Sequence, residues 1–416
     1  LEQTNALNND DLWKMRISVV FKFKGFTKKI RDYEFKDKNQ IVLSGSPNTK
    51  YNNDNSADYS IFPNYQDYGY GIFLLDEKSR DYVIKNIQNE KDDFLRTMMW
   101  GSLWDSVREA ESSPKDYVEL VIKNINVEMD ESTIQTLLNR VSTAMNYYLS
   151  DAQRTELAPK IETILTGKMQ NAPTLGQRIT FYRAFLNVAS SENARTILKG
   201  ILSGKFKIEG LNCRGDSCGR PMSEAKNVSA SRLIGQAQDL PLQNSSTILK
   251  TKDKFDIVTK LLILGDKDTP SLLAELEKTE TTDEAKRYAY AAKAGIAAAE
   301  SKAKFWNNFV NNKDVSESWI ESAFVPFNSV RHSELTLPYL ERALAELPNL
   351  KRNRKIFFVN GWLAAFVGGQ RSERALAVIN KFLADNPNMD KDLRLKILET
   401  VDGLERAVKI RKKFVD

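Results

Sequence analysis

Apolar and polar side chains alternate along residues 13–23. The even-numbered positions are charged or polar except for Val20, and the odd-numbered ones are all apolar: Trp13, Met15, Ile17, Val19, Phe21 and Phe23. A period of two predicts a β-strand with one apolar face. Residues 27–35, 39–45, 61–64 and 70–75 are further strand candidates. We therefore expect a small β domain over residues 1–75.

The pattern changes to a helical period at Asp76 and keeps that period to the C-terminus. Ser113 followed by Pro114 predicts one helix start. Two long stretches, 129–149 and 389–414, repeat apolar side chains at helical spacing: Ile134, Leu137, Leu138, Val141, Met145 and Tyr148, then Leu393, Ile397, Val401, Leu404, Val408 and Ile410. Roughly fifteen such segments in series predict a mainly α fold, a HEAT- or armadillo-like α-solenoid (α-α superhelix) over residues 76–416. The number of helices disfavours the alternative of one closed bundle.

One segment, at about 205–250, interrupts the helices. It contains both cysteines, two prolines and many Ser, Asn and Gln residues, so we interpret it as a loop insertion. Cys213 and Cys218 are candidates for a disulfide, which would suit an oxidising compartment, and two reduced thiols are the alternative. The pair slightly favours an exported or periplasmic location over the cytoplasm, and the location otherwise stays open.

The charges are nearly balanced. Lys and Arg number 61 and Asp and Glu 55, giving a net charge of +6 spread along the chain. This balance does not favour a nucleic-acid partner, and we interpret the basic run at 351–355 (KRNRK) as the solvated start of a helix. Apolar runs are shorter than the roughly 18 residues that a membrane span needs, so no span is expected. The chain begins at Leu1 without a signal-type stretch, as a mature or cut piece would.

Catalytic motifs are missing from the sequence. The HExxH helix of zinc peptidases needs two histidines, and His332 is the only histidine. A GxSxG elbow, a Walker loop and a GxGxxG loop are also missing. A zinc site built from Cys213, Cys218 and His332 would lack a fourth ligand. We expect no catalytic residue and no metal ligand here, and we interpret His332 as the entrance of a helix with Pro338 in its first turn.

The order of several motifs resembles the aminopeptidase N-like zinc metallopeptidases (the gluzincin family), in particular bacterial members. Residues 61–81 resemble the passage from the β-sandwich of that family into its helical domain, through Pro63, Asn64, Tyr70, Gly71, Leu75, Asp76, Glu77 and Ser79. The following helices match at Leu95, Arg96, Trp100, Trp104, Asp105, Arg108, Tyr117 and Glu128, and a later pair matches at Lys302 and Trp306. The resemblance runs from about Trp13 to the C-terminus, with the cysteine insertion as its main departure.

The resemblance implies the last two domains of such an enzyme, a small β-sandwich and a helical domain like that of the ER aminopeptidases. The family's HExxH, its G-x-M-E-N motif and its oxyanion-stabilising Tyr are not found here. The implied partner is therefore an N-terminal catalytic domain of the same polypeptide, which would carry the zinc, while this chain has no cofactor. The helical domain would close a chamber over that catalytic domain, and the parent enzyme would remove N-terminal residues from peptides.

Basic groups on a concave helical surface would attract the C-terminal carboxylate of a peptide. Arg331 and Arg354 are candidates for substrate binding because each lies near a predicted helix start, and His332 is a candidate on the same rim. The alternative function is a free-standing α-solenoid scaffold that binds a protein or peptide partner. The N-terminal β domain favours the first hypothesis, because a scaffold has no need of it.

Overall fold

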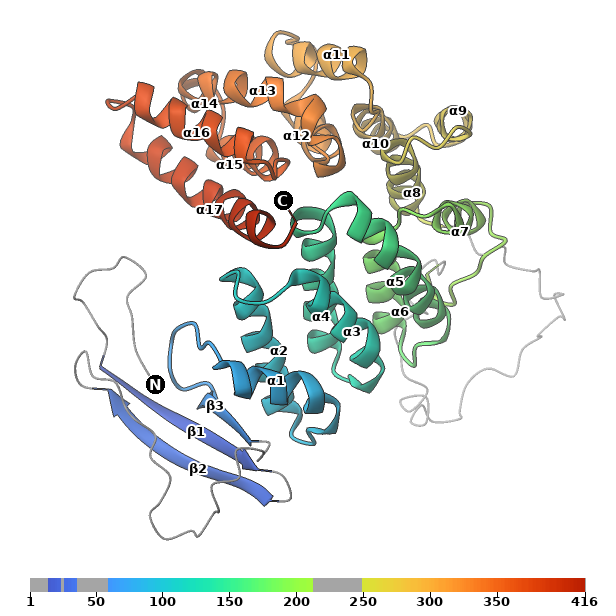
Figure 1. Cartoon of the computed structure of the whole chain (residues 1–416). Coiled ribbons are helices and arrows are strands. Elements are labelled where there is room, and N and C mark those ends of the chain that lie inside the picture. The colour runs from blue at the N-terminus through green and yellow to red at the C-terminus, as the bar shows by residue number, and fades with distance from the viewer. Residues whose placement is uncertain (1–13, 24–25, 36–58, 212–248, 416) are drawn as a thin grey trace, which may run out of the picture. The chain divides into compact units, whose positions relative to one another are not determined.

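The computed structural model describes residues 14–23, 26–35, 59–211 and 249–415 (Figure 1). Over these ranges it confirms a mainly helical protein with a small antiparallel sheet near the N-terminus. The chain divides into two compact units, one formed by Leu1–Ala144 with Lys409–Asp416 and the other by Met145–Val408. The predicted boundary between a β domain and a helical domain at residue 75 stays a prediction.

The sheet has the order β2-β1-β3, with Met15–Phe23 (β1) paired antiparallel to both Phe26–Phe35 (β2) and Tyr59–Tyr65 (β3). The predicted apolar face of β1 is confirmed by Ile17 and Val19, which are 2% and 0% exposed. Val20 is buried as well, opposite Phe62 of β3 on the other face. The strand candidate at 39–45 lies outside the residues that the structure describes. Those residues form one three-stranded sheet, so the β-sandwich stays a prediction.

The strand predicted at residues 70–75 is wrong, because this segment is irregular. A turn after β3 redirects the chain: the Asn64 side chain accepts from the Gly69 amide at 2.6 Å and donates to the Gly69 carbonyl at 2.9 Å. Asn64, Gln66 and Asp67 all have positive φ in this turn. The segment beyond it has no ladder partner among the described residues, and Ile72 is 55% exposed.

The first unit also contains the helices α1 (Glu77–Asn86), α2 (Asp93–Arg108), α3 (Pro114–Asn124) and α4 (Glu131–Thr143). The predicted start at Ser113 is confirmed, because its side chain accepts from the Asp116 amide and Pro114 occupies the first turn. α1 packs on β3 (Figure 1). The apolar positions predicted for residues 129–149 are all buried, although the last of them lie in a π-helical turn, Ala144–Tyr148.

The second unit holds the remaining helices, with the last turns of α17 counted in the first unit. Their bounds are α5 Asp151–Asn171, α6 Leu175–Val188, α7 Glu192–Leu202, α8 Thr251–Ile263, α9 Thr269–Thr279, α10 Asp283–Ala294, α11 Ala299–Val310, α12 Glu317–Phe327, α13 Ser333–Ala345, α14 Leu347–Asn353, α15 Ile356–Gly368, α16 Glu373–Asp385 and α17 Lys391–Phe414. α10 packs on α8 and α12, and α12 packs on α15, while α13 packs on α11 and α16. Alternate helices thus form two layers, which is compatible with the predicted solenoid.

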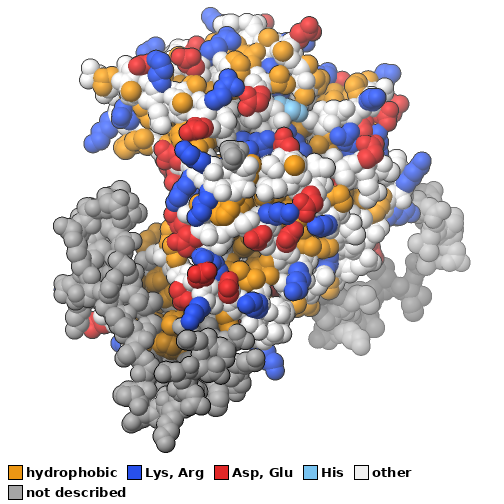
Figure 2. Space-filling view, in the orientation of Figure 1, with side chains coloured by type: hydrophobic (Ala, Val, Ile, Leu, Met, Phe, Trp, Pro, Cys, Tyr) orange, Lys and Arg blue, Asp and Glu red, His pale blue; other side chains and the backbone are white. Residues whose placement is uncertain are grey.

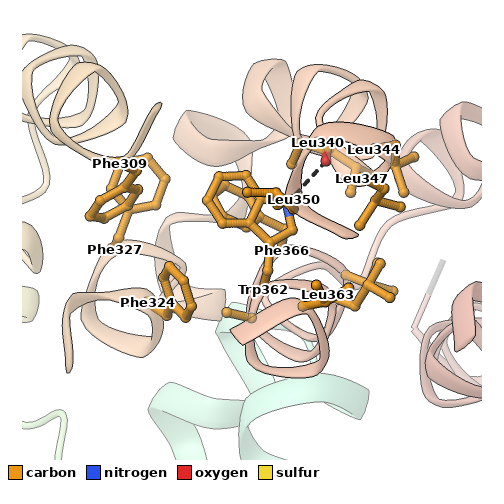
Figure 3. Close-up of a cluster of buried hydrophobic side chains, with 14 of the residues drawn as sticks. Phe309, Phe324, Phe327, Leu340, Leu344, Leu347, Leu350, Trp362, Leu363 and Phe366 are labelled. Atoms are coloured by element: carbon orange, nitrogen blue, oxygen red, sulfur yellow. Dashed lines mark hydrogen bonds between the residues drawn. The ribbon is translucent and has the colours of Figure 1, made fainter. Parts of the chain in front are cut away.

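A large hydrophobic core lies in the second unit, where aromatic side chains of α11, α12 and α15 meet (Figure 3). Trp362 is 1% exposed, packs its ring 4.4 Å from that of Phe366 and donates a hydrogen bond to the Ala343 carbonyl. At the end of α15 the backbone of Gly369 approaches that of Asn328 so closely that a Cβ would lie 2.4 Å from the Asn328 carbonyl oxygen. Helices α12 and α15 are therefore joined without room for a side chain at this point.

Two local predictions about helix starts need correction. Pro338 lies inside α13, because that helix begins at Ser333 rather than near the proline. Pro338 has no backbone N–H, so the carbonyl of Glu334 accepts no helical hydrogen bond from it. Glu334 is exposed, and water can donate to this carbonyl instead. The run at 351–355 is mainly a helix end: Lys351 and Arg352 lie in the last turn of α14, and only Lys355 begins α15, as its N-cap.

Candidate functional site

The three residues expected to bind substrate fall in two places. Arg331 and His332 lie in a 3₁₀ turn, Val330–His332 (η5), between α12 and α13. Arg354 connects α14 to α15. Its guanidinium donates to Glu317 at 3.0 Å and lies over the ring of Phe358.

The guanidinium groups of Arg354 and Arg331 do not lie at the same site. Glu317, the partner of Arg354, is the first residue of α12, whereas Arg331 follows the last residue of that helix. Ten helical steps separate the two ends by roughly 15 Å. One carboxylate therefore cannot meet both guanidinium groups, and each must be assessed by itself.

Arg331 belongs to a group of cations that we call the basic cluster: Arg154 of α5, Lys260 of α8, Arg331 of η5 and Arg371 after α15. Their charges act on one another: Arg154 and Arg371 both lower the pKa of Arg331, and Arg331 lowers that of Lys260. All four lie within the second unit. This grouping could not be predicted from the sequence, because its members are separated by 40 to 217 residues and come from different elements of the fold.

Two carboxylates lie near the basic cluster, and both are engaged. Asp151 accepts from Arg154 at 2.7 Å and from Arg371 at 3.1 Å. Glu162, which is 1% exposed, accepts from the backbone amides of Ser190 and Ser191 at 2.7 and 3.1 Å. Glu162 thereby holds the turn that begins α7.

Arg331 has the least satisfied side chain of the basic cluster. Its Nε and Nη2 atoms are buried and have no hydrogen-bond partner within the described residues. These two nitrogens form the side edge of the guanidinium, the edge that grips a carboxylate or phosphate with two parallel bonds. Burial, followed by the charge of Arg154, lowers the pKa of Arg331 to about 10.

His332 is neutral at physiological pH. Burial, and then the charges of Lys302 and Arg331, lower its pKa to about 4, against a backbone hydrogen bond at Ile263 that raises it. Its Nδ1 is buried without a partner in the part of the chain that the structure describes. A neutral imidazole adds no positive charge to a carboxylate site, so His332 is the weakest of the three candidates for electrostatic binding.

Lys302, one of the residues that carried the resemblance, joins two helix ends. Its side chain is 0% exposed, and Nζ donates to the carbonyls of Ala294 and Phe327, the last residues of α10 and α12, at 2.7 and 2.8 Å. Burial lowers its pKa to about 7. Lys302 therefore satisfies carbonyls that helix ends leave unpaired, and it serves the fold.

Other residues of the resemblance form a buried network in the first unit. Arg96 donates from Nε to both carboxylate oxygens of Glu128 at 3.0 and 3.1 Å, and Trp100 donates to the same carboxylate at 2.7 Å. The ring of Tyr117 lies 5.1 Å from that of Trp104. These matched positions stabilise the packing of α2 against α3 and against the segment that carries Glu128.

The sequence has a single histidine, and no group of three or more His, Cys, Asp or Glu side chains suited to a metal ion occurs in the described ranges. Cys213 and Cys218 lie outside the described residues, so their pairing is untested. Within the same ranges, none of the helices combines the length and apolarity of a membrane span.

Comparison with known proteins agrees with the resemblance. Residues 60–201 match the family model of the ERAP1-like C-terminal domain. The chain is also 23% identical over 349 residues to a protein of Streptomyces lividans named Aminopeptidase N. That match covers 83% of this chain but 36% of the relative, so the chain spans little more than a third of the relative's length. The two matches together support the resemblance of this chain to the C-terminal region of aminopeptidase N-like enzymes.

Proposed function

We propose that this chain is the non-catalytic C-terminal part of a zinc aminopeptidase and closes the peptide-binding chamber over a catalytic domain. The parent enzyme would remove N-terminal residues from peptides. The observation that carries the proposal is the match of residues 60–201 to the ERAP1-like C-terminal domain. The relative named Aminopeptidase N, of which the chain covers the smaller part, supports a catalytic region elsewhere in the polypeptide.

Exposed apolar side chains favour a docking partner for the helices. Val325 of α12 is 75% exposed, and Phe357 at the start of α15 is 79% exposed. The helices that present them pack on each other. Large apolar side chains left in water commonly mark interfaces. On the face seen in Figure 2, acidic and basic side chains are interspersed.

The first test is zinc content together with hydrolysis of alanyl and leucyl amide substrates by this chain alone. The proposal expects neither stoichiometric zinc nor turnover, because His332 is the only histidine. Stoichiometric zinc with turnover that a chelator abolishes would overturn it. The coding sequence before Leu1 is a second test, since an HExxH segment in the same reading frame is expected there.

Arg331, His332 and Arg354 stay the proposed contacts for the distal end of a peptide. The test compares binding of a peptide with a free C-terminal carboxylate and of the same peptide as its C-terminal amide. A carboxylate contact predicts weaker binding of the amide. Equal binding of the two peptides would remove this part of the proposal and would leave chamber closure untouched.

A further inference from the structure

A pocket in the second unit lies over α10, between the end of α9 and the first turn of α12. We call it the α10 pocket. Its volume is about 280 Å³. An apolar cavity of roughly 150 Å³ is enough to hold benzene, and pockets for larger ligands begin at about 300 Å³. The α10 pocket therefore has room for a small molecule of one or two rings.

The floor of the α10 pocket is made of alanine. Ala285 and Ala289 lie on successive turns of α10 and are 0% and 2% exposed. α9 and α12 both pack on α10. Protein interiors are otherwise filled to high density, so two methyl groups between packed helices leave space that longer side chains would occupy. The pocket is thus open because of the residues chosen for this face of α10.

One wall of the α10 pocket is aromatic. The ring of Tyr290 lies 5.5 Å from that of Trp319, with the two planes inclined by 52°. On another side, Tyr290 packs 5.0 Å from the ring of Phe305, which is buried. Trp319 is only half-buried, so part of its indole remains in contact with water. An aromatic ring in the pocket would cover this surface and gain the ring–ring contacts that aromatic side chains favour.

The charged side chains that line the α10 pocket are already paired. Their partners have the opposite charge in every case: Glu277 with Lys293, Glu280 with Lys254, and Lys286 with Asp283. The pair of Glu277 and Lys293, with 2.6 Å between its atoms, lies within the lining itself. A charged ligand would lose its hydration and would have to compete with these pairs. The lining therefore favours an uncharged ligand.

We propose that the α10 pocket binds a small, flat, uncharged aromatic molecule of the indole or phenol class. The aromatic wall selects a ring, the alanine floor provides the space, and the paired charges select against a charged group. The ligand's single N–H or O–H would stay at the charged rim, where a carboxylate can accept from it. This inference goes beyond the proposed function and does not depend on it, because the whole pocket lies within one unit of this chain.

The experiment titrates indole into the full chain labelled with 5-fluorotryptophan and follows the fluorine NMR spectrum. The chain has six tryptophans, and the resonance that is missing from Trp319→Phe identifies Trp319. We expect a saturable shift of this resonance while the others stay in place. Phenol should shift the same resonance. Benzoate and benzylamine, which are charged at neutral pH, should bind roughly tenfold more weakly or worse.

Two variants test the pocket from opposite directions, with indole binding measured by saturation-transfer NMR. Ala289→Leu fills the space, and Trp319→Ala removes the aromatic wall without crowding the core. Each should weaken indole binding roughly tenfold or more. The matched control is Tyr70→Ala, an aromatic residue of the first unit that is 99% exposed, and it should bind indole like the wild type. Urea unfolding of each variant shows that it is folded under the conditions of the titration.

Four results would overturn the proposal. They are no saturable shift of the Trp319 resonance, wild-type binding by a folded Ala289→Leu, wild-type binding by Trp319→Ala, or tighter binding of benzoate or benzylamine than of indole. N-acetyltryptophan amide carries the same ring on a peptide backbone. If it binds more tightly than indole, the ring belongs to a peptide side chain and not to a free small molecule. None of these results alters the test of chamber closure, which rests on zinc, turnover and the upstream coding sequence.

Discussion

Replacing Glu128 by Gln should destabilise the first unit by about 3 kcal/mol. Glu128 and Arg96 are 4% and 6% exposed, so water screens their interaction little. Burial, the largest single effect, would lower the pKa of Arg96, but the hydrogen bonds and charges of Glu128 and Asp93 together outweigh it and the pKa is raised. The substitution keeps the shape of the side chain and leaves a buried guanidinium facing a neutral amide.

The size of this loss depends on the hydrogen bonds that Arg96 and Trp100 keep in the variant. Removing one member of a buried ion pair commonly costs about 3–5 kcal/mol. We take the lower end because Arg96 still donates to the carbonyl of Glu90 and to Asp93, each at 2.7 Å. Trp100 also keeps an oxygen to which it can donate. A loss of this size changes the folding equilibrium on the order of 100-fold.

Urea unfolding followed by tryptophan fluorescence measures the effect. The control is the same chemical change at Glu131, an exposed residue in the first turn of α4, which should cost less than about 0.5 kcal/mol. The double substitution Arg96→Met with Glu128→Leu should recover much of the loss, because no buried charge remains unpaired. Equal midpoints for Glu128→Gln and Glu131→Gln would refute the reasoning.

Two further predictions concern the second unit. Burial lowers the pKa of Lys302 from its ordinary value of 10.5 to about 7. Between these two pH values the Lys302 side chain is protonated in the unfolded chain and deprotonated in the folded chain. Stability should therefore rise with pH across that window, and urea titrations at several pH values should show the rise in the wild type but not in Lys302→Met. Trp362→Ala should lower the free energy of unfolding by about 3–5 kcal/mol, because it opens a cavity among Phe324, Phe358 and Phe366. Thermal or urea unfolding measures this loss. A loss below about 1 kcal/mol would contradict the packing described for Trp362.

The spacing of apolar residues predicted the strands and helices well where an element buries one face and exposes the other. The alternation in β1 identified Ile17 and Val19, and the helical spacing of residues 129–149 identified side chains that are all buried. The strand predicted at residues 70–75 did not form, because the turn at Asn64 and Gly69 removes the segment from the sheet. A strand needs a partner as well as a pattern, and the partner is set by the turn that precedes it.

The candidate site was only partly predictable. Its 3₁₀ turn carries Arg331, which a helix-start argument found. Arg154 and Lys260 reach the same place from helices that lie 177 and 71 positions earlier in the sequence. Their convergence depends on how α5 and α8 pack, and a single sequence gives no information on such distant contacts. Arg354 was proposed on the same grounds as Arg331, yet α12 separates them.

The close approach at Gly369 gives a marker for aligning distant relatives. A Cβ there would lie 2.4 Å from the carbonyl oxygen of Asn328, and φ at this position is an ordinary −77°, so the requirement for glycine comes from the neighbouring backbone alone. Any homologue that brings the same two helix ends together must place a glycine opposite that carbonyl, however far its other residues have diverged. At 23% identity, where gaps between helices are hard to place, this one position fixes the register of α15 against α12.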